Sequence, residues 1–513
     1  MFAVMVLSCS NRENPEPRKG NPAINVSVDS VGNDFVRLKI QAVNFEKVHL
    51  LAVPDGGSAP ADAKALAESG IQGSTGLYRY ENLTSETSYA LYFAAEGSGG
   101  VFSKMGSLPF KTLTGSLYEW EKARSGVPFF ADLVLTYGFL NRNPKYWSEE
   151  RLRSMVSWTD PETGEEKWLF DAFLALEMRT PSYPPHTFGV GVRDWDDKSI
   201  GMLAGNKEDA TAFLDYWFMD GNGFTALDNV VGEVAARIGS PATSRKVIVM
   251  MPDLSVHERY DVPTTPTTYW GEVNGRRLDF SNVEDRRMGY YWFIDEVRKR
   301  FYEKNYQNIE LGGFYIMSEE LPSMRDGKGG RGGDMIDGQL RDGWEVLAKA
   351  WDDVFPAVSN YIHQYHEAVV WIPYRSAAGY RYWKEFGIDY AYMQPNTFWD
   401  TKGVNPMSTF FGQISTYDLA MELEFDDRMM PSPVDRSASD YNEGEDYKTY
   451  QARWRSYIEG MQSSGVYGVK PIAVYQDTDT FNHLRKSSYK EDIDAFNELC
   501  RLIAEDPLKA KNR

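Results

Sequence analysis

The chain has 513 residues, of which 42% are hydrophobic and 25% are charged. This is the composition of a folded globular protein, and the length suits two domains rather than one. Lys and Arg number 55 against 74 Asp and Glu, which gives a formal net charge of −19. So acidic a balance argues against a nucleic-acid partner, because phosphate backbones are bound by basic faces.

The sequence gives no sign of a metal or cofactor site. Cys9 and Cys500 are its two cysteines, too few for a disulfide framework or a cysteine-based zinc site. His363 and His366 have no acidic ligand nearby in helical register, and the glycine-rich run 327–334 lacks the ending of a phosphate loop. We therefore expect neither a metal nor a cofactor.

The N-terminus is predicted to be a signal and tether, residues 1–22. Residues 2–7 are a short apolar run, and Val6–Cys9 resembles the lipobox of bacterial lipoproteins, although the basic segment before it is missing. The resemblance implies lipidation of Cys9 and a place in the cell envelope of a Gram-negative bacterium, at the outer membrane. The alternative is an ordinary N-terminus with a chance cysteine. The polar, proline-rich residues after Cys9 are typical of a tether.

Residues 23–113 are predicted to form a small β-sandwich. Short runs of strand length alternate with turn residues here. Leu83 and Tyr89 resemble the leucine and the corner tyrosine of the fibronectin type III family, which implies an all-β spacer domain.

From residue 117 to 513 strands alternate with helical stretches, the pattern of a parallel β/α architecture. Eight such units over this length predict a (β/α)8 barrel with enlarged loops, an α/β fold. The predicted strands are residues 132–137, 168–177, 246–252, 311–320, 367–374, 388–394, 418–424 and 470–476.

Barrel enzymes carry their chemistry at the carboxyl ends of the strands, and these ends are polar in this sequence. Polar ends are expected of any strand that meets water. That expectation does not explain why carboxylates follow both the fourth and the seventh strand, with amides and tyrosines around them. The candidate substrate-binding residues are Tyr137, Glu177, Trp195, Asp253, His257, Tyr374, Arg375, Tyr392, Gln394, Asn396, Trp399, Tyr475 and Gln476.

Two of these strand ends resemble those of the large clan of retaining barrel glycosidases, which place a glutamate acid/base after strand four and a glutamate nucleophile after strand seven. Ser318-Glu319 stands where the clan often has Asn-Glu, and Glu424-Phe425 is similar to its strand-seven pair. The asparagine that touches the sugar in the clan is missing, which leaves that contact open to a different donor.

Side-chain alternation decides between neighbouring glutamates. Phe314, Ile316 and Ser318 form the better helix-facing set, which turns Glu319 rather than Glu320 into the barrel. Glu422 and Glu424 both point inward, and Glu424 lies nearer the mouth. We expect Glu319 to be the acid/base and Glu424 the nucleophile, with Glu320 and Glu422 as alternates.

The segment from Val127 to about Glu505 is similar to the bacterial domain-of-unknown-function 4855 family. The similar stretches are residues 168–174, 313–320, 388–396 and 421–426. The resemblance implies a glycoside-hydrolase-like barrel in lipoproteins of polysaccharide-degrading bacteria, without naming a substrate.

The sequence therefore predicts a glycosidase that acts on a poly- or oligosaccharide, as a monomer whose one membrane contact is its lipid anchor. The alternative is a surface carbohydrate-binding lipoprotein that has lost catalysis. The roles of individual rim residues stay open: Arg375 either lowers the pKa of the nucleophile, binds an acidic sugar or forms a surface ion pair. Trp195, Trp270 and Trp399 are candidates for stacking on sugar faces, and we expect one of the three to do so.

If Cys9 carries the lipid, a Cys9→Ala chain expressed in its native host should move from the membrane fraction to the soluble fraction, because the hydrophobic anchor is gone. Fractionation and immunoblotting measure this. Continued membrane association of the variant would contradict the lipobox interpretation.

Overall fold

The computed structural model describes residues 20–31, 35–84, 87–112, 129–138, 146–182, 184–190, 203–254, 270–280, 282–326, 335–336, 339–340, 344–400, 403, 406–431, 441, 444–477 and 479–511. The chain separates into two compact units. One is built mainly from Val36–Thr112 with the strand before it, and the other holds the residues from 129 onward.

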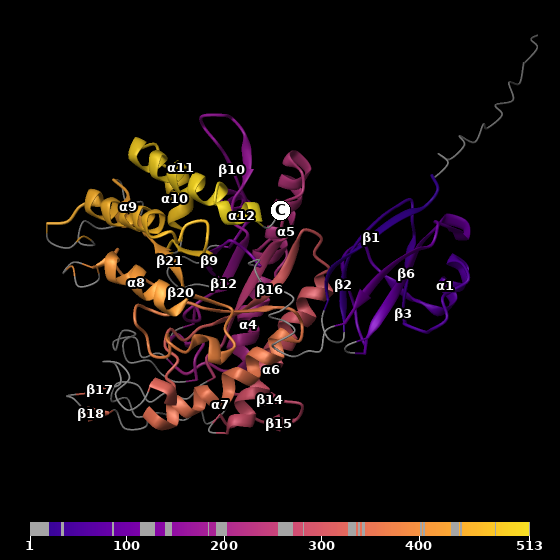
Figure 1. Cartoon of the computed structure of the whole chain (residues 1–513), viewed down its shortest axis with the longest axis horizontal. Helices are drawn as coiled ribbons and strands as arrows, with labels where there is room; N and C mark the ends of the chain where they lie inside the picture. The colour runs from indigo at the N-terminus through magenta and orange to yellow at the C-terminus, as the bar shows by residue number, and fades with distance from the viewer. Residues whose placement is uncertain are drawn as a thin grey trace, which may run out of the picture. The chain divides into compact units, whose positions relative to one another are not determined.

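The first unit consists of two antiparallel sheets that share one apolar core (Figure 1). β1, β2 and β5 form one sheet, while β4, β3, β6 and β7 form the other, with β8 paired to β6. Val36 and Leu38 from the first sheet pack with Leu50 and Leu91 from the second, and all four are buried. The strands are β1 (Ala23–Val31), β2 (Val36–Val43), β3 (Lys47–Pro54), β4 (Ile71–Gly73), β5 (Gly76–Tyr80), β6 (Ser88–Gly97), β7 (Val101–Phe102) and β8 (Gly106–Lys111).

One short helix, α1 (Ala63–Ser69), departs from the all-β expectation for this unit. Asp62 caps it by accepting a hydrogen bond from the Ala65 N–H at 2.8 Å. The Tyr89 hydroxyl accepts a hydrogen bond from the Thr84 N–H at 2.9 Å, a contact of the kind that a corner tyrosine makes. The assignment of this unit to the fibronectin type III family stays a prediction.

The second unit is a closed barrel of eight parallel strands in chain order, with helices around it (Figure 1). Strands at all eight predicted places form the barrel. They are β9 (Asp132–Tyr137), β12 (Ala172–Leu176), β13 (Arg245–Met251), β16 (Ile309–Ile316), β19 (Ala368–Trp371), β20 (Tyr390–Met393), β21 (Ala420–Glu424) and β22 (Ile472–Tyr475).

The helices of this unit fill the intervals between the strands. They are α3 (Glu149–Val156), α4 (Lys207–Trp217), α5 (Gly223–Ile238), α6 (Val283–Lys304), α7 (Trp344–His363), α8 (Met407–Tyr417), α9 (Tyr447–Ser464), α10 (Thr480–Lys486), α11 (Lys490–Ala504) and α12 (Pro507–Lys511). Short hairpins join β10 (Ser157–Thr159) to β11 (Glu166–Trp168), β14 (Glu272–Val273) to β15 (Arg276–Arg277) and β17 (Met335–Ile336) to β18 (Gln339–Leu340).

Local sequence signals fix where these helices begin and end. The Asn206 side chain accepts hydrogen bonds from the first turn of α4, and Asp209 bonds back to the Asn206 N–H, which makes a capping box. Asp446 caps α9 by accepting a hydrogen bond from the Thr449 N–H, and Gly465 ends it in the left-handed conformation that glycine adopts at little cost. None of the helices in the described part of the chain combines the length and apolar character that a bilayer-spanning helix requires.

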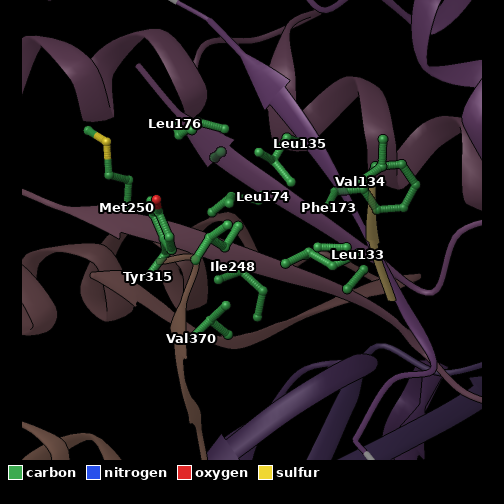
Figure 2. Close-up of a cluster of buried hydrophobic side chains, with 14 of the residues drawn as sticks. Leu133, Val134, Leu135, Phe173, Leu174, Leu176, Ile248, Met250, Tyr315 and Val370 are labelled. Atoms are coloured by element: carbon green, nitrogen blue, oxygen red, sulfur yellow. The ribbon is translucent and has the colours of Figure 1, made fainter. Parts of the chain in front are cut away.

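The barrel interior is packed with large apolar side chains. Figure 2 shows this cluster, in which Leu135, Leu174, Ile248, Tyr315 and Val370 come from five successive barrel strands and are buried. The pairing places these residues on one face, because partners in a parallel pair point the same way. The interior is therefore a core and not a pore, and polar groups lie at its ends.

A β-bulge in β16 decides which residues of that strand face inward. Val247 pairs with Leu311, but Ile248 pairs with Gly313, so Gly312 is an extra residue. A Cβ on Gly313 would lie 2.1 Å from the Ala368 carbonyl oxygen, so no other residue fits there. The bulge reverses the alternation of the strand and turns Tyr315 into the barrel, in phase with Glu319 further along the chain.

The amino ends of the strands are closed by buried ion pairs. Lys509 of α12 lies 2.7 Å from Asp132, and Asp171 accepts a hydrogen bond from Arg245 at 2.8 Å. Asp171 also accepts from the Ala131 N–H at 3.1 Å. The predicted second strand, 168–177, is shorter in the structure: Trp168 belongs to β11, and Asp171 precedes β12 at the base of the barrel.

Lys509→Met should lower the free energy of unfolding by about 3–5 kcal/mol at pH 8, because it leaves the buried Asp132 carboxylate without its cation. Burial raises the pKa of Asp132 to about 7, and Asp171 adds to the rise while Lys509 opposes it. In the variant the pKa of Asp132 rises further, so the folded state takes up a proton at Asp132 on acidification. The loss of unfolding free energy relative to the parent is therefore smaller at pH 5 than at pH 8.

Chemical denaturation at both pH values measures the effect. Lys490→Met is the matched control, because the Lys490 side chain is 82% exposed in its pair with Asp494 and should cost no more than about 0.5 kcal/mol. An equal loss at pH 5 and pH 8 would contradict the account of this cluster.

Candidate active site at the carboxyl end of the barrel

Three glutamates meet at the carboxyl ends of β16 and β21. Glu422 and Glu424 are alternate residues of β21 and pair with Ala473 and Tyr475 of β22, so they share the face that looks into the barrel. Glu319 follows β16 by three residues, and its charge acts on both of them. Glu319 is exposed, whereas Glu422 and Glu424 are 2% and 0% exposed, so the cluster reaches from the open mouth into the core.

The three carboxyls differ in the hydrogen bonds they receive. The Asn396 N–H donates to Glu424 Oε1 at 3.1 Å, and the Tyr457 hydroxyl donates to Glu424 Oε2 at 2.6 Å. Gln394 Nε2 donates to Glu319 Oε1 at 2.9 Å. Glu422 Oε1 is buried and has no hydrogen-bond partner. Both oxygens of Glu424 are therefore held by hydrogen bonds from the protein.

Burial dominates the proton affinity of these groups. It raises the pKa of Glu424 to about 8, a rise opposed by the bonds from Tyr457 and Asn396 and increased by the charge of Glu319. Burial, then Glu424, then Glu319 raise the pKa of Glu422 well above its usual value. At neutral pH the cluster thus keeps protons that exposed carboxyls would have lost.

Aromatic side chains form one wall of the site. Tyr137 and Tyr475 meet edge to face with ring centres 6.1 Å apart, and Tyr475 meets Trp399 at 5.6 Å in the same way. Burial raises the pKa of Tyr137, and Tyr475, Glu422 and Glu319 add to the rise, so this wall adjoins the carboxyls. Trp399 Nε1 donates to Asp426 Oδ2 at 3.2 Å, which fixes the indole.

Arg375 and Tyr374 lie half-buried beyond β19. Arg375 donates to the Pro406 carbonyl at 3.0 Å and to the Thr409 hydroxyl, so its guanidinium ties β19 to the start of α8. The groups that set the pKa of Glu424 include no arginine, so the role of Arg375 as a cation next to the nucleophile has no support.

Four further predicted residues lie deeper in the protein. Glu177, Asp253, Tyr392 and Gln476 are between 0% and 3% exposed. Gln476 Nε2 donates to the Leu135 carbonyl at 3.2 Å, and its oxygen accepts from the Phe481 N–H at 3.1 Å. The backbone of Asp253 bonds to Phe188 and Val190. These contacts hold strand ends in place, and the amide of Gln476 is used inside the protein.

The remaining predictions fall elsewhere. Cys9, Trp195 and His257 lie outside the described residues. Trp270 is 2% exposed and packs against Phe280 and Trp292 in the core, so it is not the one of the three candidate tryptophans that stacks on a sugar. In the described part of the chain no group of three or more His, Cys, Asp and Glu side chains is arranged to hold a metal ion.

Tyr457 is the site residue that the sequence did not reveal. It lies in α9, 33 positions after Glu424, and is buried. Its hydroxyl also accepts a hydrogen bond from the Phe398 N–H, so it links the loop after β20 to the end of β21. A search of strand ends does not reach a helix residue, and nothing in the helical pattern sets this tyrosine apart.

A closed (β/α)8 barrel with a buried carboxyl cluster at its carboxyl end is the class of protein that these observations define. The chain belongs to the family described as domain of unknown function DUF4855, whose model matches residues 132–329 and 346–501. This match confirms the family predicted from the sequence. No curated protein matches the chain.

Solved structures of low similarity include two β-glucuronidases. That of Ruminococcus gnavus is 11% identical, with a TM-score of 0.33, and that of Lactobacillus rhamnosus is 9% identical, with a TM-score of 0.30; each match covers 89% of this chain and 60% of the other. The chain thus spans about 60% of the length of these enzymes. A Bacteroides fragilis protein provisionally assigned as an α-galactosidase is 10% identical, with a TM-score of 0.33, and the match covers 96% of this chain and 79% of the other.

Tyr457→Phe should raise the pKa of Glu424 above about 8 by about one to two pH units, because a hydrogen bond to a charged group contributes about 1.5–3 kcal/mol. Carbon NMR of glutamate-labelled protein follows the titration. Tyr450→Phe is the control on the same helix, since its hydroxyl bonds to Glu445 and not to the cluster. An unchanged Glu424 titration in Tyr457→Phe would contradict the described hydrogen bond.

Proposed function

We propose that this protein is a glycoside hydrolase that acts on a poly- or oligosaccharide, with Glu319 and Glu424 as its catalytic pair. One observation carries the proposal. The carboxyls of Glu319, beyond β16, and Glu424, at the end of β21, repel one another electrostatically at the barrel mouth. Glu319 is exposed, Glu424 is buried, and both lie beside an aromatic wall. Glycoside hydrolysis needs two carboxyls in opposite protonation states, and burial with mutual repulsion produces such a difference.

The surroundings of the two carboxyls support different roles. Glu319 is open to solvent, so in its protonated form it can reach the oxygen of a leaving sugar and give up its proton. Glu424 receives two hydrogen bonds, which oppose the rise that burial causes in its pKa and stabilise the ionised form that attacks carbon once the proton of the pair lies on Glu319. Each bonded oxygen of Glu424 still has a second lone pair.

The proposed reaction has two steps. Glu319 protonates the glycosidic oxygen, the bond from that oxygen to the anomeric carbon breaks, and Glu424 forms an ester with the carbon. Glu319 then removes a proton from water, the water oxygen bonds to the anomeric carbon, and Glu424 leaves as a carboxylate. This retaining course needs the carboxyls ~5–5.5 Å apart, against ~6.5–9.5 Å for an inverting pair.

The aromatic wall supports a carbohydrate as the substrate. Tyr137, Tyr475 and Trp399 present ring surface next to the carboxyls, and sugar rings have apolar faces that pack on such surfaces. Gln394, whose amide already bonds to Glu319, is the described side chain best placed to replace the asparagine of the glycosidase clan. Lipidation at Cys9, an outer-membrane location and a monomeric state remain part of the proposal.

One observation favours the alternative of a carbohydrate-binding lipoprotein without catalysis. Glu424 is 0% exposed, and both its oxygens accept hydrogen bonds, which is also how a structural carboxylate is held. In this alternative the aromatic wall binds sugar, and the carboxyls stabilise the barrel end. Turnover in variants of the two glutamates separates the alternatives.

On any polysaccharide from which the parent releases reducing ends, Glu424→Ala should lower the rate by at least about a hundredfold, and azide should restore turnover by attacking in place of the carboxylate. Glu319→Ala should lose activity on natural substrates to a similar extent. It should keep its activity on aryl glycosides, because their leaving groups need no proton. Glu320→Ala serves as the control and should stay within a few-fold of the parent.

Parent-like activity of both Glu319→Ala and Glu424→Ala would refute the catalytic pair. Sugar binding without turnover by the parent would favour the binding protein. Azide rescue at Glu422→Ala in place of Glu424→Ala would move the nucleophile to the alternate residue.

A further inference from the structure

Glu422 has no assigned part in the proposed reaction, and its position is unusual. It lies in the middle of β21 on the inward face, one side-chain layer below Glu424, and is 2% exposed. Its Oε1 is buried and receives no hydrogen bond. A buried carboxylate without a donor is costly, whereas a buried carboxylic acid is tolerated.

The groups around Glu422 offer no positive charge among the described residues. Glu424 on its own strand and Glu319 beyond β16 are both acidic, and each raises its pKa. Tyr137, at the end of β9, interacts with Glu422 and is a weak acid itself. Tyr475 of β22 and Tyr392 of β20 lie on the same inward face. Nothing in this set stabilises a third negative charge.

Hydrogen-bond donors rank the three carboxyls. Glu424 accepts from two donors and Glu319 accepts from Gln394, while Glu422 Oε1 has no donor. Donors stabilise the ionised form, so Glu422 should be the last of the three to lose its proton. This ranking rests on contacts and burial.

We propose that Glu422 is a permanently protonated, neutral acid at neutral pH, and that it acts as a positioning residue beneath the Glu319/Glu424 pair. Because Glu422 stays neutral, Glu319 and Glu424 are the carboxyls of the cluster that exchange protons. Together these two hold one proton and one negative charge. The protonation is a property of the fold alone, whereas the positioning role rests on the proposed function.

Infrared difference spectroscopy tests the protonation without any substrate. The spectrum of the parent minus that of Glu422→Gln at pH 7 should contain the carbonyl band of one protonated carboxyl, and glutamate labelled with carbon-13 should shift that band. Glu320→Gln is the control and should remove no such band. A carboxylate band in place of the carboxylic acid band would overturn the proposal.

Stability gives a second readout with a definite sign. A raised pKa in the folded state means that folding takes up a proton, so the stability from this group is full below about pH 4.5 and falls as pH rises. Relative to Glu422→Gln, the folding equilibrium constant of the parent should therefore fall tenfold per pH unit between pH 6 and pH 8. A constant difference would overturn the protonation. If Glu422→Gln does not fold, the infrared titration of the labelled parent decides alone.

The activity profile tests the positioning role. The pair is active while it holds one proton, so kcat/KM should fall above about pH 8, where the pair loses that proton and Glu319 can no longer protonate the leaving oxygen. Replacing a neutral acid by a neutral amide should leave that alkaline limb where it is, whatever happens to the maximal rate. Loss of a charged Glu422 would instead move the limb toward acid pH by about a unit or more, which would overturn the proposal.

The two parts of the proposal fail separately. If Glu422 is protonated but the protein turns over no substrate, the protonation stands. The proposed function and the positioning role both fail. An ionised Glu422 in an active enzyme removes the proposal and leaves the proposed function intact.

Discussion

The burial of carboxyls inside the carboxyl end of a closed barrel is the constraint on which the site depends. Parallel strands that close on themselves leave an interior filled by side chains, and most of this interior is apolar (Figure 2). Glu422 and Glu424 enter it because they alternate along β21 with buried apolar residues that face the helices. A carboxyl buried there is stable only if it is protonated or if its charge receives hydrogen bonds.

The surrounding structure supplies both. The loop after β20 presents the Asn396 N–H to Glu424, and Asn396 adopts a left-handed conformation there with φ of 55°. Helix α9 presents Tyr457 from the outer ring. The base of the barrel solves the same problem differently, with Lys509 and Arg245 against Asp132 and Asp171. Cations close the end that is structural, and the carboxyl end depends on hydrogen bonds and protons.

Much of this fold could be predicted from the sequence, since the eight strands are short apolar runs separated by helical segments. The inward direction of Glu319 was also predictable, because Phe314 and Ile316 define the helix-facing set. Its physical cause, the bulge at Gly312 and Gly313, is a property of the strand pairing. The donors of Glu424 could not be predicted, because Tyr457 and Asn396 reach it through tertiary contacts that leave no periodic signal. The burial of Trp270 was missed for the same reason.

If Glu424 is the nucleophile, it becomes covalently bound to the substrate sugar during the reaction. Incubation with activated 2-deoxy-2-fluoro glycosides, followed by peptide mass spectrometry, tests this most directly, because the fluorine slows hydrolysis of the intermediate more than its formation. The peptide that contains Glu424 should carry the mass of one fluorinated sugar, and no such mass should appear in Glu424→Gln. An enzyme that turns over its substrate with no adduct, or with the adduct on another residue, would contradict this role of Glu424.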